Sequence, residues 1–279
     1  FSGSKNININ ETAKYWLKRM MNPTGQEPFL PYGKSESLYQ NFINFLFYFI
    51  SEKQKEIFKS VVFSFIISVK NKNTKKIKYW VEKTPLNELY TEKLLRLFPK
   101  AKFINVVRDP IQNIISLKRL DKIRNRKSNM LQKALFQVFL IKRSLRNQQN
   151  IKNYKIITYE NLTGKTEKTM REISRFLGIE FSESLTVPTI NGISATANSM
   201  DSSKRLRGKI VKTTNNKEKL NELNKTEKII CVNILSLHKP YLHLIKTKYP
   251  ELAENIKPVY VFIAKFTYFL YRIYRKTVK

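Results

Sequence analysis

The chain has 279 residues, of which 42% are hydrophobic and 12% aromatic, and this composition is that of a globular protein with a substantial core. Its 53 Lys+Arg outnumber 21 Asp+Glu, and the formal charge of +32 favours polyanionic partners such as nucleic acid, anionic membranes, nucleotide phosphates or acidic glycans. The alternative is a Lys-, Asn- and Ile-rich composition without functional meaning. Cys231 is the only cysteine, which excludes an internal disulfide and a thiolate metal cluster and favours a reducing, cytoplasmic compartment.

The first third of the chain is predicted to be helical with one long loop. Residues 11–21 have an amphipathic helical pattern, and the proline- and glycine-containing stretch 22–33 is typical of a loop. Two apolar stretches follow at 42–50 and 61–69, each shorter than the roughly 20 residues that cross a bilayer. We expect them to be core helices packed on a sheet, with 70–78 as a solvated connection.

The centre of the chain alternates helices with short apolar strands. Leucines and aromatic residues recur at helical spacing over 86–98, and Pro99 ends that helix. The run 101–107 is apolar and β-branched, which predicts a strand buried on both faces. Asp109 and Pro110 then supply an N-cap and a first-turn proline for the next helix.

The same alternation continues downstream. A basic helix is predicted over 128–148, a second buried strand over 154–159, and another helix over 166–177 closed by Gly178. Helices that alternate with short buried strands indicate an α/β fold with a parallel sheet.

Beyond residue 180 the pattern changes. A Ser-, Asn- and Gly-rich loop is predicted at 187–212, and helical patterning returns at 216–249. The stretch 257–276 is apolar, aromatic and basic, and we expect a packed helix there, with an interfacial membrane anchor as the alternative. The chain is therefore divided into one α/β domain at 1–256 and a basic aromatic C-terminal helix at 257–279.

One position combines features of an anion site. In an open parallel sheet, ligands bind beyond the carboxyl ends of the strands, and the strand 101–107 leads directly into Arg108. We expect free N–H groups at the start of the next helix to face the same edge, with Ser116 two turns into it. A guanidinium is suited to a phosphate. The alternative is that Arg108 pairs with a carboxylate and that Ser116 has no special role.

Four segments resemble the PAPS-dependent sulfotransferases, in particular the branch of tyrosylprotein and related bacterial sulfotransferases. They are "EKTPLNELYTEKLLRLFPKAKFINVVRDPIQNIIS" at 82–116, "YENL" at 159–162, "REISRFLGIEF" at 171–181 and "PTINGISATANSM" at 188–200. Their order and spacing agree with the family over roughly residues 79–215. The resemblance implies a P-loop-NTPase-like α/β fold.

The resemblance also implies a reaction and its site. A sulfuryl group would pass from 3′-phosphoadenylyl sulfate (PAPS) to an acceptor hydroxyl, leaving PAP, without a metal. Arg108 and Ser116 would hold the 3′-phosphate, Tyr159 would contact the nucleotide near its adenosine, and Lys83 would lie near the transferring group. Ser199 and the loop after it would close over the donor, and the candidates there for a phosphate contact are Lys204, Arg207 and Lys209.

The family pattern is incomplete at the N-terminus. The family's loop for the 5′-phosphosulfate is absent, and "FSGSK" at 1–5 lacks its order and preceding strand. No histidine precedes His238, so the general base is expected to be a carboxylate, and Glu11 is the nearest candidate. Since the chain begins at Phe1, we expect an incomplete form of an active enzyme, with an inactive nucleotide-binding homologue as the alternative.

Other functions and the partners follow from charge and motifs. A basic nucleic-acid-binding protein is the second hypothesis, but no helix-turn-helix, zinc-finger or RNA-recognition pattern occurs, so we expect no nucleic-acid partner. An ATP-dependent P-loop kinase is disfavoured because GxxxxGK[ST] is missing. We expect an acidic hydroxyl-bearing acceptor: a glycan, a lipid-linked saccharide or a protein tyrosine. The expected location is cytoplasmic, with peripheral membrane contact through 257–276 as an option.

Overall fold

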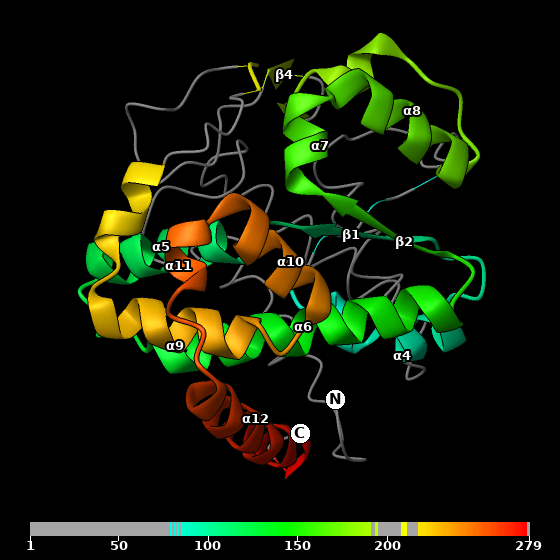
Figure 1. The fold of residues 1–279 in the computed structure, drawn as a ribbon. Helices are drawn as coiled ribbons and strands as arrows, with labels where there is room; N and C mark the ends of the chain where they lie inside the picture. The colour runs from blue at the N-terminus through cyan, green and yellow to red at the C-terminus, as the bar shows by residue number, and fades with distance from the viewer. Residues whose placement is uncertain are drawn as a thin grey trace. The chain divides into compact units, whose positions relative to one another are not determined.

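A computed structural model of the chain describes residues 79, 81, 83, 85–190, 193–194, 208–210 and 217–277 (Figure 1). The chain forms two compact units, Phe1–Thr84 and Pro85–Lys279, and every helix and strand described below belongs to the second. The helices expected at 11–21 and within 38–70 lie outside the described residues. The proposed division at residue 256 stays a prediction.

The helix expected over 86–98 is divided into two pieces. A short 3₁₀ helix, η2 (Asn87–Leu89), precedes α4 (Thr91–Leu97). The Asn147 side chain donates a hydrogen bond of 2.7 Å to the Glu88 carbonyl, which a continuous helix would have used for its own ladder. At the point where the expected helix divides, the Glu88 carbonyl is therefore bound by a residue far along the chain and by the nearby Thr91 hydroxyl.

Two parallel strands of this unit pair with each other. β1 (Phe103–Val107) pairs with β2 (Tyr154–Thr158), and the last residues of the two strands, Val107 and Thr158, are partners. A parallel sheet between helices was expected and is observed. Burial on both faces of β1 was expected and is wrong: Val106 is 46% exposed, and in the described part of the chain β1 has a strand neighbour on one side only.

The two helices that follow β1 begin with capping residues, of which the sequence predicts Asp109. In α5 (Pro110–Ile123), the Asp109 carboxylate accepts hydrogen bonds from two backbone N–H groups of the first turn. In α6 (Met130–Asn150), the Asn129 side chain accepts from the Gln132 N–H. A side-chain acceptor at the N-cap satisfies donors that have no partner inside the helix.

The segment after β2 turns at once into helix. Thr158 caps α7 (Tyr159–Gly164), so Tyr159, expected as the last strand residue, is the first helical one. α8 (Thr166–Leu177) ends at Gly178, whose φ of 71° is a left-handed conformation that glycine adopts at little cost. β1–α5 and β2–α7 are thus two strand–helix units running in the same direction.

After α8 the chain forms a small hairpin and then a group of helices. Between α8 and these helices lie η3 (Glu183–Thr186) and a two-stranded antiparallel hairpin of β3 (Thr189–Ile190) and β4 (Ile193–Ser194). The helical elements are η5 (Lys217–Glu222), α9 (Lys225–Leu235), α10 (Lys239–Lys248), α11 (Pro250–Ala253) and α12 (Pro258–Thr277). α9 packs along α6, and a continuous hydrophobic cluster joins α5, α6 and all of these helices.

The C-terminal helix predicted at 257–276 is present as α12. It packs on α9 and α6 through one face, on which Ala264 and Tyr268 are buried in the core cluster. Among the described residues, no helix is both long enough and apolar enough to cross a membrane.

Candidate functional site

The candidate site lies where the two parallel strands end. Because β1 and β2 are parallel and in register, Arg108 and Tyr159 follow them at the same edge of the sheet. The Arg108 guanidinium carbon lies 5.0 Å from the centre of the Tyr159 ring, a cation–π distance. We call the group Arg108, Asp109, Tyr159 and Glu160 the strand-edge site.

Arg108 retains hydrogen-bonding capacity. Within the part of the chain that the structure describes, its Nε nitrogen is buried and has no hydrogen-bond partner. The two neighbouring carboxylates bind other groups: Asp109 caps α5, and Glu160 accepts a hydrogen bond of 3.1 Å from the Asp109 backbone N–H. These two carboxylates therefore leave the Arg108 Nε without an acceptor among the described residues.

Asp109 is held from two directions. Its Oδ1 atom accepts from the N–H groups of Ile111 (3.0 Å) and Gln112 (3.2 Å). Its Oδ2 atom accepts from the Lys248 ammonium (2.6 Å) and from the Tyr249 hydroxyl (2.7 Å) at the end of α10. The Asp109 side chain is 2% exposed, so these four donors satisfy a buried carboxylate.

The Tyr249 hydroxyl remains a donor in this network. Burial, followed by the nearby Asp109 carboxylate, raises the pKa of Tyr249 above its ordinary value. The Gln112 side chain donates a further hydrogen bond of 3.2 Å to the same hydroxyl. The end of α10 is thus tied to the residue that follows Arg108.

The helix start does not supply free N–H groups to an anion. We expected this contribution, but the Ile111 and Gln112 N–H groups already donate to Asp109. The positive charge at the strand edge therefore comes from the Arg108 side chain, and the N-terminal end of α5 is neutralised by its own cap.

Ser116 and Lys83 are two further predicted site residues. Ser116 is exposed on α5, six residues after Pro110 and about 9 Å further along the helix axis. The structure records no contact from it to Arg108 or Tyr159 among the described residues. Lys83 is exposed and belongs to the first compact unit.

The predicted closing loop is described only in part. Lys209 is exposed and follows Gly208, whose φ of 64° is left-handed and whose Cα lies so close to β4 that an added Cβ would stand 3.2 Å from the Ser194 side chain. Glu11, Ser199, Lys204 and Arg207 lie outside the described residues. Their roles stay predictions.

The histidines have ordinary environments. His238 is buried against the Tyr241 ring, with centroids 4.9 Å apart, and burial together with Lys142 lowers the pKa of His238. His243 is exposed on α10. In the described part of the chain, no three His, Cys, Asp or Glu side chains are grouped as metal ligands would be.

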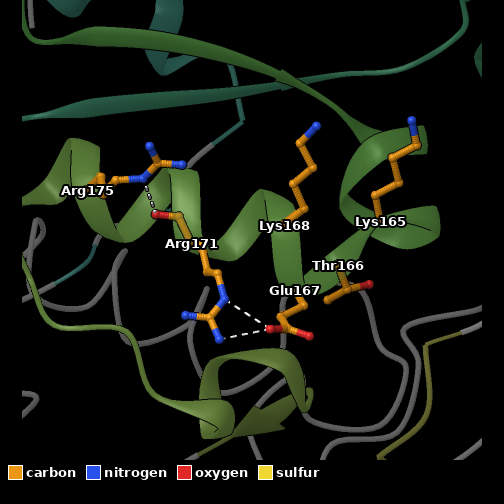
Figure 2. Close-up of a pocket in the computed structure, with 6 residues that line it drawn as sticks. All are labelled: Lys165, Thr166, Glu167, Lys168, Arg171 and Arg175. Carbon is orange, nitrogen blue, oxygen red and sulfur yellow. Dashed lines mark hydrogen bonds and ion pairs between the residues drawn. The ribbon is translucent and has the colours of Figure 1, made fainter.

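A second group of cations lies on α8 around an open depression of about 460 Å³ (Figure 2). Its lining residues, here called the α8 basic face, are Lys165, Thr166, Glu167, Lys168, Arg171 and Arg175. Figure 2 shows Arg171 turned toward Glu167, to which it forms an ion pair of 2.8 Å, and Arg175 donating to the Arg171 carbonyl. None of the predicted site residues belongs to this face.

Sequence reasoning missed the residues that hold Asp109. Lys248 and Tyr249 lie 139 and 140 positions beyond it, and no local motif marks them as its partners. The cap role of Asp109 was the available signal, because a buried cap with a second free oxygen requires further donors.

The sequence was compared with family models, curated proteins and solved structures. A model described as "Sulfotransferase family" matches residues 34–183, which is more than half of the chain. The matched range contains Lys83, Arg108, Ser116 and Tyr159. No curated protein and no solved structure matches the chain.

Proposed function

The chain belongs to the sulfotransferase family, and from this premise we propose that it binds PAPS and transfers the sulfuryl group to an acceptor hydroxyl. Arg108 and Ser116 bind the 3′-phosphate of the donor, and Tyr159 lies beside its nucleotide portion. Lys83 is the cation near the transferring group, and Ser199 and Lys209 belong to the segment that closes over the donor.

One observation carries the proposal. Arg108 stands at the carboxyl end of a parallel strand, stacked on Tyr159, with a buried Nε that no described residue binds. Ligands of parallel α/β sheets bind at this edge, and a planar guanidinium can donate two parallel hydrogen bonds to a phosphate. The 3′-phosphate distinguishes PAPS from ADP and ATP, so its recognition is the feature to test.

The fold that we propose is P-loop-like. The two parallel strand–helix units, β1–α5 and β2–α7, support a sheet of that type, with the site at the strand ends. In such a fold the strands run parallel because each is followed by a helix that returns the chain to the opposite edge.

The proposed transfer needs no redox partner. The acceptor oxygen attacks the sulfur and forms a new S–O bond, while the bond from sulfur to the bridging phosphate oxygen breaks and PAP leaves with the electron pair. The hydroxyl proton passes to a carboxylate base, for which Glu11 is the candidate in this chain. Lys83 stabilises charge on the oxygens, since such transfers depend mainly on positioning and electrostatics.

The acceptor class follows from the charge of the protein. With +32 formal charges, the chain attracts acidic molecules. We propose an acidic acceptor with a free hydroxyl: a glycan, a lipid-linked saccharide or a tyrosine flanked by carboxylates. Product formation should fall more steeply with added salt for such acceptors than for neutral ones, because salt screens the attraction.

The test is calorimetric titration of PAP into the protein, with ADP as the control ligand. We expect Arg108→Ala to weaken PAP binding about fiftyfold, because hydrogen bonds to a charged group are lost, and to change ADP binding little. Arg124→Ala is the matched control, since Arg124 is exposed at the other end of α5, and it should leave PAP binding within about twofold.

Three results would overturn the proposal or part of it. Equal weakening of PAP and ADP by Arg108→Ala would remove the 3′-phosphate role from Arg108. Failure of PAP to bind, together with salt-dependent binding of random-sequence DNA, would favour the nucleic-acid hypothesis. Selective PAP binding without transfer to any acceptor would favour an inactive homologue.

A further inference from the structure

The C-terminal helix α12 presents an apolar face that the described core does not use. Its exposed members include Phe262, Ile263, Phe266, Phe269, Leu270 and Ile273, with exposed fractions between 46% and 74%. At 3.6 residues per turn they fall within an arc of about 120°. Single exposed apolar side chains are common, but a contiguous aromatic and aliphatic strip marks an interaction surface.

The opposite face of α12 holds the helix to the protein. Ala264 and Tyr268 are buried in the core cluster, and the Arg275 guanidinium stacks on the Phe136 and Phe139 rings at 5.5 and 5.4 Å. The apolar strip therefore points away from α6 and α9. In Figure 1, α12 is the red helix beyond α9.

Cations line one border of the strip. Lys265, Arg272 and Lys276 are exposed and fall on the flank between the buried face and the apolar face. Residues 258–277 contain no Asp or Glu. An apolar face rich in aromatic residues beside a row of cations is the arrangement of helices that lie in the plane of a membrane interface.

We propose that α12 docks the protein on an anionic lipid bilayer, with the apolar strip in the headgroup and upper acyl region and Lys265, Arg272 and Lys276 at the lipid phosphates. Charge complementarity selects this occupant. A second copy of the chain would bring another +32 charges against the same row of cations. The docking is peripheral, because α12 is held to the core along its other side.

The experiment is flotation of the protein with phosphatidylcholine vesicles, with and without phosphatidylglycerol. We expect binding to the anionic vesicles. The triple variant Phe262→Ser, Phe266→Ser, Phe269→Ser should reduce that binding at least about a hundredfold. Removing the cations with Lys265→Gln, Arg272→Gln and Lys276→Gln should reduce it about fivefold for each charge.

Matched controls separate docking from general basicity. Exposed apolar residues elsewhere are replaced in Ile123→Ser, Leu131→Ser, Val187→Ser, and exposed lysines elsewhere in Lys122→Gln, Lys152→Gln, Lys246→Gln. Both control variants should bind anionic vesicles within a few-fold of the native chain. Circular dichroism verifies that each variant is folded, which is expected because the replaced side chains are exposed.

Any of three outcomes overturns the proposal. The native chain fails to bind anionic vesicles, or the serine variant binds as the native chain does, or the lysine controls weaken binding as much as the α12 cations do. If vesicles do not bind and the serine variant instead dissociates a dimer in sedimentation, the strip is an interface between copies. None of these outcomes bears on PAP binding, so the docking proposal and the proposed function fail independently.

Discussion

The strand-edge site and the α8 basic face are both rich in cations, but they are built differently. At the strand edge, Arg108 and Tyr159 come from two strand–helix units, and Asp109 beside them is bound by Lys248 and Tyr249 from α10. The α8 basic face consists of neighbouring side chains around a single helix, and its pair of Arg171 and Glu167 is largely exposed.

In a very basic protein, a high density of positive side chains does not by itself identify an anion-binding site. On α8 the Arg171 guanidinium also lies on an aromatic ring, 3.9 Å from the centre of Phe181, but its charge is already paired with the largely exposed Glu167. At the strand edge the cation is stacked, partly buried and supported by a buried carboxylate that is held from several elements. Preorganised groups of that kind can recognise one phosphate.

The largest effect is expected on stability, when Asp109 beside Arg108 is replaced. Asp109→Ala removes the acceptor of Lys248, Tyr249 and the first turn of α5, and should lower the free energy of unfolding by about 3 kcal/mol. Urea unfolding measures it.

The control for Asp109 is Asp121→Ala on the same helix. Asp121 pairs with Lys133 at 2.5 Å nearer the surface, and its loss should cost about 1 kcal/mol or less. If the two variants are equally stable, the buried network at Asp109 does not stabilise the fold as described.

A smaller effect, on PAP binding, is expected when the Tyr159 ring that contacts Arg108 is replaced. Tyr159→Leu removes the aromatic face but keeps an apolar side chain, and should weaken PAP binding about fivefold through loss of the cation–π contact. Titration of PAP measures it. Tyr159→Phe keeps the ring and should bind within about twofold of the native chain; a loss as large as that of the leucine variant would mean that the hydroxyl acts instead.

The smallest effect is expected on α8. Arg171→Ala breaks an exposed ion pair and a cation–π contact with Phe181, and should lower the free energy of unfolding by about 1 kcal/mol or less, with PAP binding unchanged. Urea unfolding and the PAP titration check both values. A loss of PAP affinity larger than that of Arg108→Ala would reverse the comparison between the two regions.

Local features were predictable because they depend on residues close in sequence. The strands 103–107 and 154–158, the cap at Asp109 and the left-handed Gly178 follow from propensity, hydrogen-bonding capacity and backbone freedom within a few positions. The family resemblance rests on the same segments, which include Arg108.

Other features could not be predicted because a distant residue decides them. Where the helix expected over 86–98 divides, the distant Asn147 side chain donates to the Glu88 carbonyl. The free N–H groups expected at α5 are a different case, because the Asp109 cap that the sequence predicts already binds them. Val106 is 46% exposed because its face of β1 is not fully covered by packed elements, which the spacing of apolar residues does not state.

The sequence by itself determined the family, the order of the parallel strand–helix units and the position of Arg108 at the end of a strand, since these depend on short-range patterns. Only the tertiary structure decided that Tyr159 stacks on Arg108, that Lys248 and Tyr249 hold Asp109, and which face of α12 remains exposed. Such contacts join residues tens to more than a hundred positions apart, and packing in three dimensions selects them among many partners that the sequence permits.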